Sequence, residues 1–150
     1  MIEIKNVSKK FGKLEVLKNV SVSCKSGQCI ALIGPNGCGK TTLIKSILGM
    51  VLPDEGSMEF NQKSIFGDYS YREKIGYMPQ IGRYPDTMTI GEIIEMVKKI
   101  RNSKDNLDED LFRDFEIEKM LNKQMRTLSG GTTQKISAVL AFLFNPDVLI

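Results

Sequence analysis

Hydrophobic and polar positions alternate over short distances in the first part of the chain, a pattern typical of strands. The alternation predicts strands at residues 2–7, 16–24 and 57–60, with a turn over residues 6–12. In the second of these strands Leu17, Val20 and Val22 are expected to face inward. A further short strand is expected from Lys74 to Met78. The N-terminal part is therefore predicted to be rich in strands.

From Thr89 onward the apolar period changes from about two residues to about 3.6, which predicts helices. One amphipathic helix carries Ile90, Ile93, Ile94, Val97 and Ile100 on a single face. A second mostly helical stretch is expected over residues 111–121, and the two together predict a helical subdomain at about residues 89–127. A later helix begins near Ser129 and ends at Asn145–Pro146, and a new apolar strand opens at Asp147.

The apolar run Cys29–Ile33 is expected to form a buried strand that leads into a glycine-rich turn and then a helix. The turn matches the pattern G-x-x-x-x-G-K-[ST] at Gly34, Gly39, Lys40 and Thr41. Glycines in such a turn allow backbone N–H groups to point at a phosphate, and the helix N-terminus adds a partial positive charge. The strand–turn–helix setting therefore predicts a nucleotide-binding loop, and a plain glycine-rich turn is the alternative.

The roles expected in this loop follow from its chemistry. Lys40 should reach the β- and γ-phosphates of a bound nucleotide, and the Thr41 hydroxyl should ligate Mg²⁺. Cys38 lies near a helix N-terminus, which favours a reactive thiol, although a small space-filling residue is an equal interpretation. The residues expected to contact the nucleotide here are Gly34, Pro35, Asn36, Gly37, Cys38, Gly39, Lys40, Thr41 and Thr42.

Two further positions are candidates for nucleotide contact. Phe11 lies upstream of the loop, where an aromatic ring either offers its face to a base or packs at a strand end, and its position alone does not decide between these. Ser129, Gly130 and Gly131 open a helix. Serine is a good N-cap, but paired glycines in a first turn lower helix stability, which suggests that an anion approaches the exposed amides.

Composition restricts the function classes further. The 150 residues suit one domain, 41% are hydrophobic and 26% charged, and the formal charge of +3 comes from mixed Lys and Glu rather than a basic block, so no nucleic-acid partner is expected. No secretory signal is visible, and no apolar run approaches the roughly 20 residues of a membrane span. The three cysteines form no metal-ligand pattern, and the chain contains no histidine to act as a general base.

These motifs together resemble the nucleotide-binding subunit of ATP-binding-cassette (ABC) transporters, and the resemblance runs nearly end to end. It places Phe11 at the adenine-stacking A-loop, Gly34–Thr42 at the Walker A loop, and Gln80 at the Q-loop, whose Gln contacts Mg²⁺ and senses the γ-phosphate. Leu128–Gly131 matches the signature motif, which in the family closes over the nucleotide of an opposite subunit. The implied fold is α/β: a P-loop NTPase core with an N-terminal antiparallel β-subdomain and an inserted helical subdomain.

The sequence departs from the family pattern in two places. The fifth signature position is usually Gln and is Thr132 here. The chain also ends before the family's Walker B aspartate, its catalytic glutamate, the D-loop and the switch histidine, so it is expected to be incomplete at the C-terminus. Asp147 precedes its apolar run, whereas the Walker B aspartate follows one, so we expect Asp147 to lie at the entry of a strand.

The function implied by the resemblance is ATP hydrolysis that powers transport through a membrane permease. The expected cofactors are ATP and Mg²⁺, with Lys40 and Gln80 in catalysis and Thr41 and Gln80 at the metal. The expected partners are the permease and a second ATPase subunit in a head-to-tail dimer, at the cytoplasmic face of the membrane. The alternatives are an ABC-type ATPase that acts on nucleic acid or ribosomes, and nucleotide binding without turnover. A GTPase is disfavoured because Asn122–Met125 lacks the Asp of the guanine-recognition motif.

Overall fold

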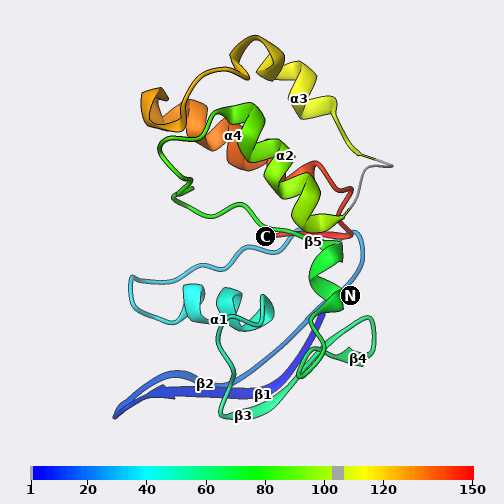
Figure 1. Ribbon diagram of the computed structural model, residues 1–150. Coiled ribbons are helices and arrows are strands. Elements are labelled where there is room, and N and C mark those ends of the chain that lie inside the picture. Colours follow the sequence, from blue (N-terminus) through cyan, green and yellow to red (C-terminus); the bar gives the residue numbers. More distant parts are fainter. Residues whose placement is uncertain (1, 103–106) are drawn as a thin grey trace. The chain divides into compact units, whose positions relative to one another are not determined.

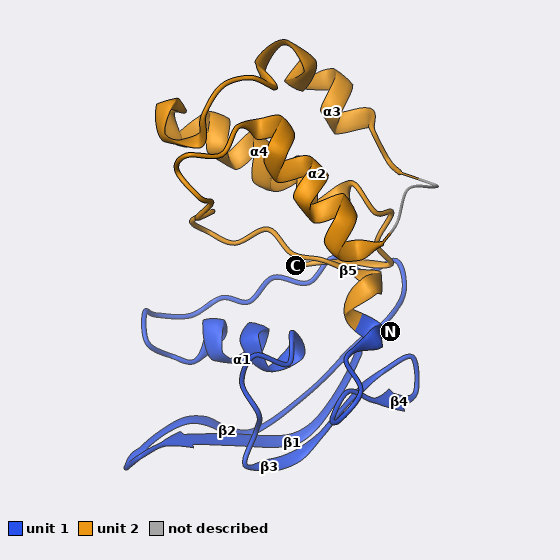
Figure 2. Ribbon diagram, in the orientation of Figure 1, with its two compact units in different colours: residues 1–71 blue, residues 72–150 orange. Residues whose placement is uncertain are grey.

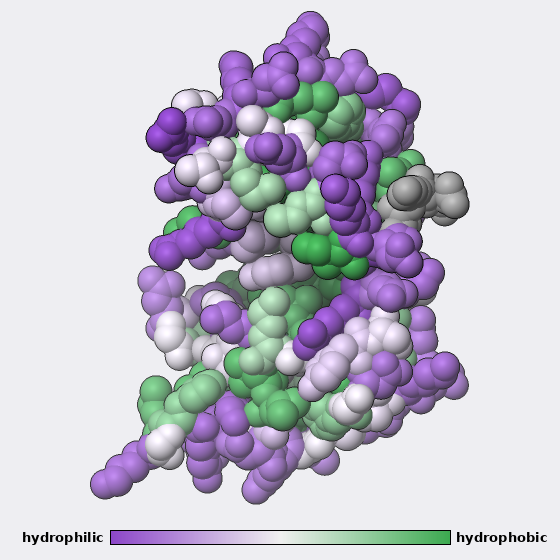
Figure 3. Space-filling model, viewed as in Figure 1, coloured by the Kyte–Doolittle hydropathy of each residue, from purple (hydrophilic) through white to green (hydrophobic). Residues whose placement is uncertain are grey.

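A computed structural model describes residues 2–102 and 107–150, and the chain divides into two compact units, residues 1–71 and 72–150 (Figure 2). Each unit has its own buried core. Residues 34–42, the predicted phosphate loop, belong to the first unit, and Gln80 and residues 128–131 belong to the second. On the face that Figure 3 shows, hydrophilic residues cover most of the surface, and apolar residues gather in separate patches.

Unit 1 contains an antiparallel sheet with helix α1 on one side of it (Figure 1). The strand order is β2-β1-β3-β4. Ile4, Val7 and Met58 are almost completely buried in this unit. Of the positions predicted to face inward in β2, Leu17 is buried, whereas Val20 and Val22 are half-buried. The elements are β1 (Ile2–Phe11), β2 (Leu14–Cys24), α1 (Lys40–Ile47), β3 (Glu55–Phe60) and β4 (Lys63–Ser64).

The predicted turn over residues 6–12 is wrong, because β1 continues to Phe11 and the turn is formed by Gly12 and Lys13. Asn6 adopts a positive φ of 51°, and the pairing register with β2 shifts after Ile4 and again after Val7. These irregularities break the apolar alternation without ending the ladder. Phe11 therefore pairs with Leu14 at the tip of the hairpin.

The expected buried strand over Cys29–Ile33 is also not present. Residues 28–35 have no assigned secondary structure, and Ile33 is 92% exposed. A strand is stabilised by ladder hydrogen bonds on at least one side, and no described strand pairs with this run. Its apolar composition predicts burial, but it finds no pairing partner among the described residues.

Unit 2 combines a short parallel ladder with a helical cluster. Strands β5 (Ile75–Gly76) and β6 (Val148–Leu149) pair in parallel, which supplies the α/β element of the fold. The helical elements include α2 (Ile90–Arg101), α3 (Asp110–Asp114) and α4 (Gly130–Phe142). The short 3₁₀ turns are η1 (Ser70–Lys74), which begins at the end of unit 1, η2 (Ile117–Met120) and η3 (Met125–Thr127).

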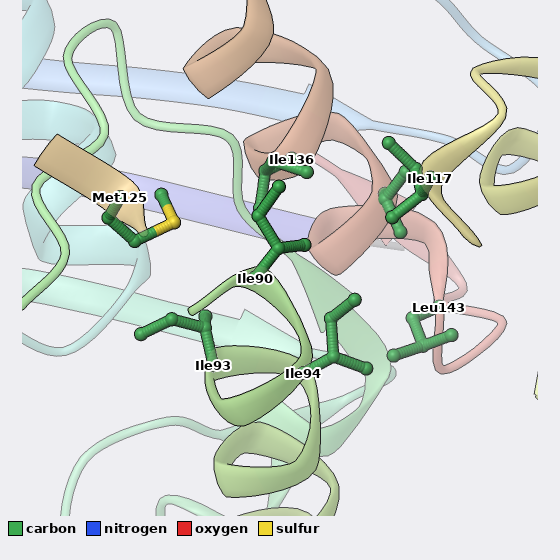
Figure 4. Close-up of a cluster of buried hydrophobic side chains, with 8 residues drawn as sticks. Ile90, Ile93, Ile94, Ile117, Met125, Ile136 and Leu143 are labelled. Carbon is green, nitrogen blue, oxygen red and sulfur yellow. The ribbon is translucent and has the colours of Figure 1, made fainter. Parts of the chain in front are cut away.

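The core of unit 2 is built by apolar side chains from α2, α4 and the turns between them, which point toward one another in Figure 4. Ile90 and Ile93 of α2 and Ile136 of α4 are fully buried, as the helical period predicts. Ile100, expected on the same face of α2, is 74% exposed. The expected helix over residues 111–121 is interrupted, because α3 ends at Asp114 and Glu116 takes a left-handed conformation with φ 52°. That conformation does not continue a right-handed helix. No helix within residues 2–102 and 107–150 is long and apolar enough to cross a membrane.

Candidate functional site

Residues 34–42, the predicted phosphate loop, form a tight turn in which Gly37 and Gly39 are required for different structural reasons. Gly37 has φ 82° and Gly39 has φ 95°, both in the left-handed region that favours glycine. A Cβ at Gly39 would also lie 2.7 Å from the carbonyl oxygen of Val16, so the loop packs directly on β2. At Gly37 a Cβ would meet nothing within 4 Å, so only the backbone conformation requires glycine there.

Lys40 folds back over the loop that precedes it. Its Nζ donates to the carbonyl oxygens of Gly34 at 2.7 Å and Pro35 at 2.8 Å, and lies 3.7 Å from the sulfur of Cys38. In the described part of the chain no carboxylate forms an ion pair with Lys40. The Lys40 ammonium is therefore hydrogen-bonded to neutral carbonyl oxygens of the loop. A negatively charged ligand is a stronger acceptor and can replace them.

The N-terminus of α1 is left open. Its N-cap is Gly39, which makes no side-chain hydrogen bond to the helix, and no acidic residue lies in the first turn. The first amide groups of a helix have no intrahelical partners, and they form the positive end of the helix dipole. Thr41 is exposed and Thr42 half-buried in the same turn. The loop thus offers amide donors, an ammonium and a hydroxyl to a ligand, and no carboxylate that would repel a triphosphate.

Phe11 is 50% exposed at the end of β1, so it is not part of the buried core. The ammonium of Lys9 lies 5.5 Å from the centre of its ring. This exposure leaves aromatic surface for a planar ligand, which is what an adenine platform requires.

In unit 2, Gln80 follows the parallel ladder. The N–H of Met78 donates to the carbonyl oxygen of Ile150 at 2.8 Å, so the pairing continues almost to Gln80, whose side chain is exposed. At the other end of the ladder the N–H of Asp147 donates to the oxygen of Lys74. Asp147 therefore lies at the entry of β6, as expected from its place before the apolar run.

The segment after Gln80 packs against α4, a contact that the sequence did not predict. The hydroxyls of Tyr84 and Ser137 are 2.9 Å apart, and a Cβ at Gly82 would lie 2.4 Å from the Ser137 oxygen. Gly82 and Tyr84 line a hollow of about 420 Å³ together with Arg83, Asp86, Met125 and Thr133. No pattern in the sequence relates a glycine near the Q-loop to a serine more than 50 residues later.

The signature residues form the N-terminus of α4. The hydroxyl oxygen of Ser129 accepts from the N–H of Thr132 at 3.2 Å and lies 2.9 Å from the Thr132 hydroxyl, which confirms the predicted N-cap. Gly130 and Gly131 are exposed, and a Cβ on either would meet nothing within 4 Å. Packing would therefore allow a side chain at either position. With glycine at both, no side chain covers the first amides of α4.

The site residues predicted from sequence therefore lie in two groups. Phe11 and the loop from Gly34 to Thr42 belong to unit 1, and Gln80 and Ser129–Gly131 belong to unit 2. Across residues 2–102 and 107–150 no three Cys, Asp or Glu side chains gather as metal ligands. The candidate metal donors in these groups are the Thr41 hydroxyl and the Gln80 side-chain oxygen.

Comparison with known proteins identifies the family of this chain. Residues 17–150 match the ABC transporter family. The chain is 30% identical to the sulfate/thiosulfate import ATP-binding protein CysA of Pseudomonas syringae pv. tomato and 31% identical to that of Pectobacterium atrosepticum. Each alignment covers 99% of this chain and 48% of the relative, so the chain spans about half the length of these curated relatives.

Solved structures show the same fold. An ATP-binding subunit of an ABC transporter superposes with a TM-score of 0.87 at 29% identity, covering 99% of this chain and 64% of that one. The ATP-binding cassette MJ0796, solved as a dimer in a post-hydrolysis state with ADP and Pi, gives 0.81 at 26% identity, covering 99% of this chain and 72% of that one. The fold is that of an ABC ATPase domain, and this chain belongs to the ABC transporter family.

Proposed function

We propose that this chain binds ATP with Mg²⁺ at the loop Gly34–Thr42. The observation that carries the proposal is the open N-terminus of α1, with the ammonium of Lys40 held beside it by the carbonyls of Gly34 and Pro35. An uncapped helix end and a lysine without a carboxylate partner together suit a polyphosphate. Exposed Phe11 supplies an aromatic surface for the base.

The loop residues fit the phosphoryl-transfer chemistry of P-loop ATPases. Lys40 neutralises charge on the β- and γ-phosphates, and the amides of the loop hold the phosphates in place. Mg²⁺ would supply positive charge that offsets the charge developing on the transferred phosphoryl group. In our proposal the Thr41 hydroxyl and Gln80 hold the metal. Catalysis of this kind depends on positioning and charge neutralisation.

We further propose that ATP hydrolysis occurs in a head-to-tail dimer. In this arrangement Ser129, Gly130 and Gly131 of one subunit close over the nucleotide held by the other. The accessible first-turn amides of α4 support this role, because a helix end with no acidic residue attracts phosphate. Hydrolysis then powers the movement of a substrate through a membrane permease, with this chain at the cytoplasmic face. The two CysA relatives are named for sulfate and thiosulfate import, and our proposal for this chain leaves the substrate open.

Calorimetric titration with nucleotides tests the binding proposal. With Mg²⁺ present, ATP and ADP should bind, and AMP should bind far more weakly because it lacks the phosphates that the loop surrounds. A matched pair, Thr41→Ser and Thr41→Ala, separates the hydroxyl from the methyl group. The serine variant should keep the Mg²⁺ dependence of ATP binding and the alanine variant should lose it. Equal affinity for AMP and ATP would contradict the proposal.

A further inference from the structure

Asp54 forms a clamp on the end of β1. Its Oδ1 accepts from Nζ of Lys9 at 2.7 Å, and its Oδ2 accepts from the backbone N–H of Lys10 at 2.7 Å. Its own N–H donates to the carbonyl oxygen of Ser8 at 2.9 Å. Asp54 therefore forms hydrogen bonds with three consecutive residues of β1.

The clamp acts directly beside Phe11. Lys9, whose side chain is only 16% exposed, places its ammonium 5.5 Å from the centre of the Phe11 ring while it donates to Asp54. A cation over an aromatic face is attracted by the ring, so Lys9 restrains the ring from one side. Phe11 itself remains 50% exposed, which leaves surface for a ligand. Asp54 thus contacts Lys9, and Lys9 in turn contacts the Phe11 ring.

The clamp also relates Phe11 to the phosphate loop. Asp54 lies in the segment after α1, the helix that follows the phosphate loop. The loop itself packs against β2, where Gly39 lies close to the carbonyl oxygen of Val16. Strand β2 pairs with β1 up to the Phe11–Leu14 pair. The start of α1 is therefore tied to β2, and the segment that leaves α1 is tied to β1. Both ties fix the distance between the aromatic ring and the loop.

We infer that Asp54, acting through Lys9 and Lys10, is a positioning residue that holds Phe11 for the base of a nucleoside triphosphate. The inference rests on the proposed nucleotide binding and adds a residue that serves the base and not the phosphates. The Lys9 hydrogen bond, followed by the Lys10 amide, lowers the pKa of Asp54, so the clamp is ionised at neutral pH.

The inference is tested by comparing a ligand with a base and one without. ATP and inorganic tripolyphosphate should be titrated, with Mg²⁺, into the wild type and Asp54→Asn. We expect ATP affinity to fall about three- to tenfold, part of what a lost stacking contact costs, with tripolyphosphate affinity unchanged. Lys9→Met keeps the apolar stem and removes the ammonium, and should show the same selective loss. Asp68→Asn is the matched control, because Asp68 accepts two comparable hydrogen bonds from Ser70 and should affect neither ligand.

A double-mutant cycle with Phe11→Ala identifies the route of the effect. If Asp54 acts through the ring, Asp54→Asn should cost no further ATP affinity in the Phe11→Ala background. An equal loss for ATP and tripolyphosphate, or a loss that persists without Phe11, would overturn the inference and leave the proposed function standing. A wild type that binds tripolyphosphate and ATP equally overturns the inference as well, since the base then contributes nothing. Failure of the wild type to bind either ligand would overturn both.

Discussion

The N-termini of α1 and α2 differ in what satisfies their first amide groups. Helix α2 has a complete capping box, in which the Thr89 hydroxyl accepts from the Glu92 N–H and the Glu92 carboxylate accepts from the Thr89 N–H. The N-cap of α1 is Gly39, which provides no side-chain cap, and no acidic residue lies in the first turn. A capping box both pairs the free amides and places a negative charge at the positive helix end. The first amides of α2 are therefore capped by its own side chains, whereas those of α1 remain uncapped and can bind an anion.

Helix α4 lies between these two cases. Ser129 caps it, but without the carboxylate that completes the box in α2. Thr132 stands at the third position of the helix, where α2 has Glu92, and binds Ser129 through its hydroxyl. A helix N-terminus alone therefore does not indicate an anion site. The residues at the start of the helix are more informative, because they show whether its first amides are already capped.

Lys40 gives the largest expected effect, because it supplies the charge at the open end of α1. Lys40→Ala should weaken ATP binding on the order of a hundredfold, as expected for loss of a charge that pairs with phosphate. Lys45→Ala is the control, since Lys45 is exposed in the last turn of the same helix. Titration with a fluorescent ATP analogue measures both. Similar losses in the two variants would show that only general charge matters.

Phe11 extends the comparison from the phosphates to the base. Phe11→Ala should weaken ATP binding by about 1–3 kcal/mol, the usual range for stacking of a base on an aromatic side chain. Tripolyphosphate binding should not change. Leu14→Ala removes the exposed apolar partner of Phe11 across the hairpin and should leave both affinities intact. If Leu14→Ala has the same effect as Phe11→Ala, the ring contributes only to hairpin stability.

The caps of α2 and α4 should be equally important for stability but not for assembly. Thr89→Ala and Ser129→Ala should each lower the free energy of unfolding by about 1 kcal/mol, measured by urea denaturation. Only Ser129→Ala should also weaken ATP-dependent dimerisation, measured by size-exclusion chromatography. Dimers that form equally in both variants would leave Ser129 with the capping role alone.

The smallest effect is the pH dependence of the Asp54 clamp. Asp54 has a pKa below its ordinary value in the folded chain, so it binds protons less readily there than when unfolded. Its contribution to stability is therefore complete above the ordinary aspartate pKa and is lost as the pH falls through the lowered, folded value. The stability difference between wild type and Asp54→Asn should be constant near neutral pH and disappear in acid. A difference that grows in acid has the wrong sign for this clamp.

Local sequence signals predicted much of the fold and of the candidate site. The Thr89 helix start, the first part of the apolar stripe of α2 and the Ser129 cap depend on neighbours within one or two turns, and the structure has all three. The end of the stripe differs, because Ile100 is largely exposed. The glycine pattern around Lys40 likewise predicted a loop and a helix in the correct order.

Features that depend on distant residues were not predicted. Cys29–Ile33 is apolar enough for a buried strand, but a strand also needs a partner, which the local pattern does not contain. Asp54 reads as a turn residue, and its bonds to Lys9 and Lys10 connect positions more than 40 residues apart. The contact between Tyr84 and Ser137 has the same origin. In each case the residue type is known from the sequence, but the residue that it contacts is known only from the fold.

The central claim is that the uncapped N-terminus of α1 binds phosphate. Its most direct test is to introduce into α1 the carboxylate that caps α2. Thr42 occupies in α1 the position that Glu92 occupies in α2, so Thr42→Glu introduces the carboxylate that the open helix end lacks, and Thr42→Gln is its neutral match in size. Mg-ATP binding to the two variants should be compared by calorimetry, with thermal unfolding as the control for folding. We predict that Thr42→Glu binds ATP at least about tenfold more weakly than Thr42→Gln, because like charge at the helix end opposes phosphate, while its unfolding temperature is equal or higher. Equal ATP affinity in the two variants would contradict the claim that the open end of α1 is the phosphate site.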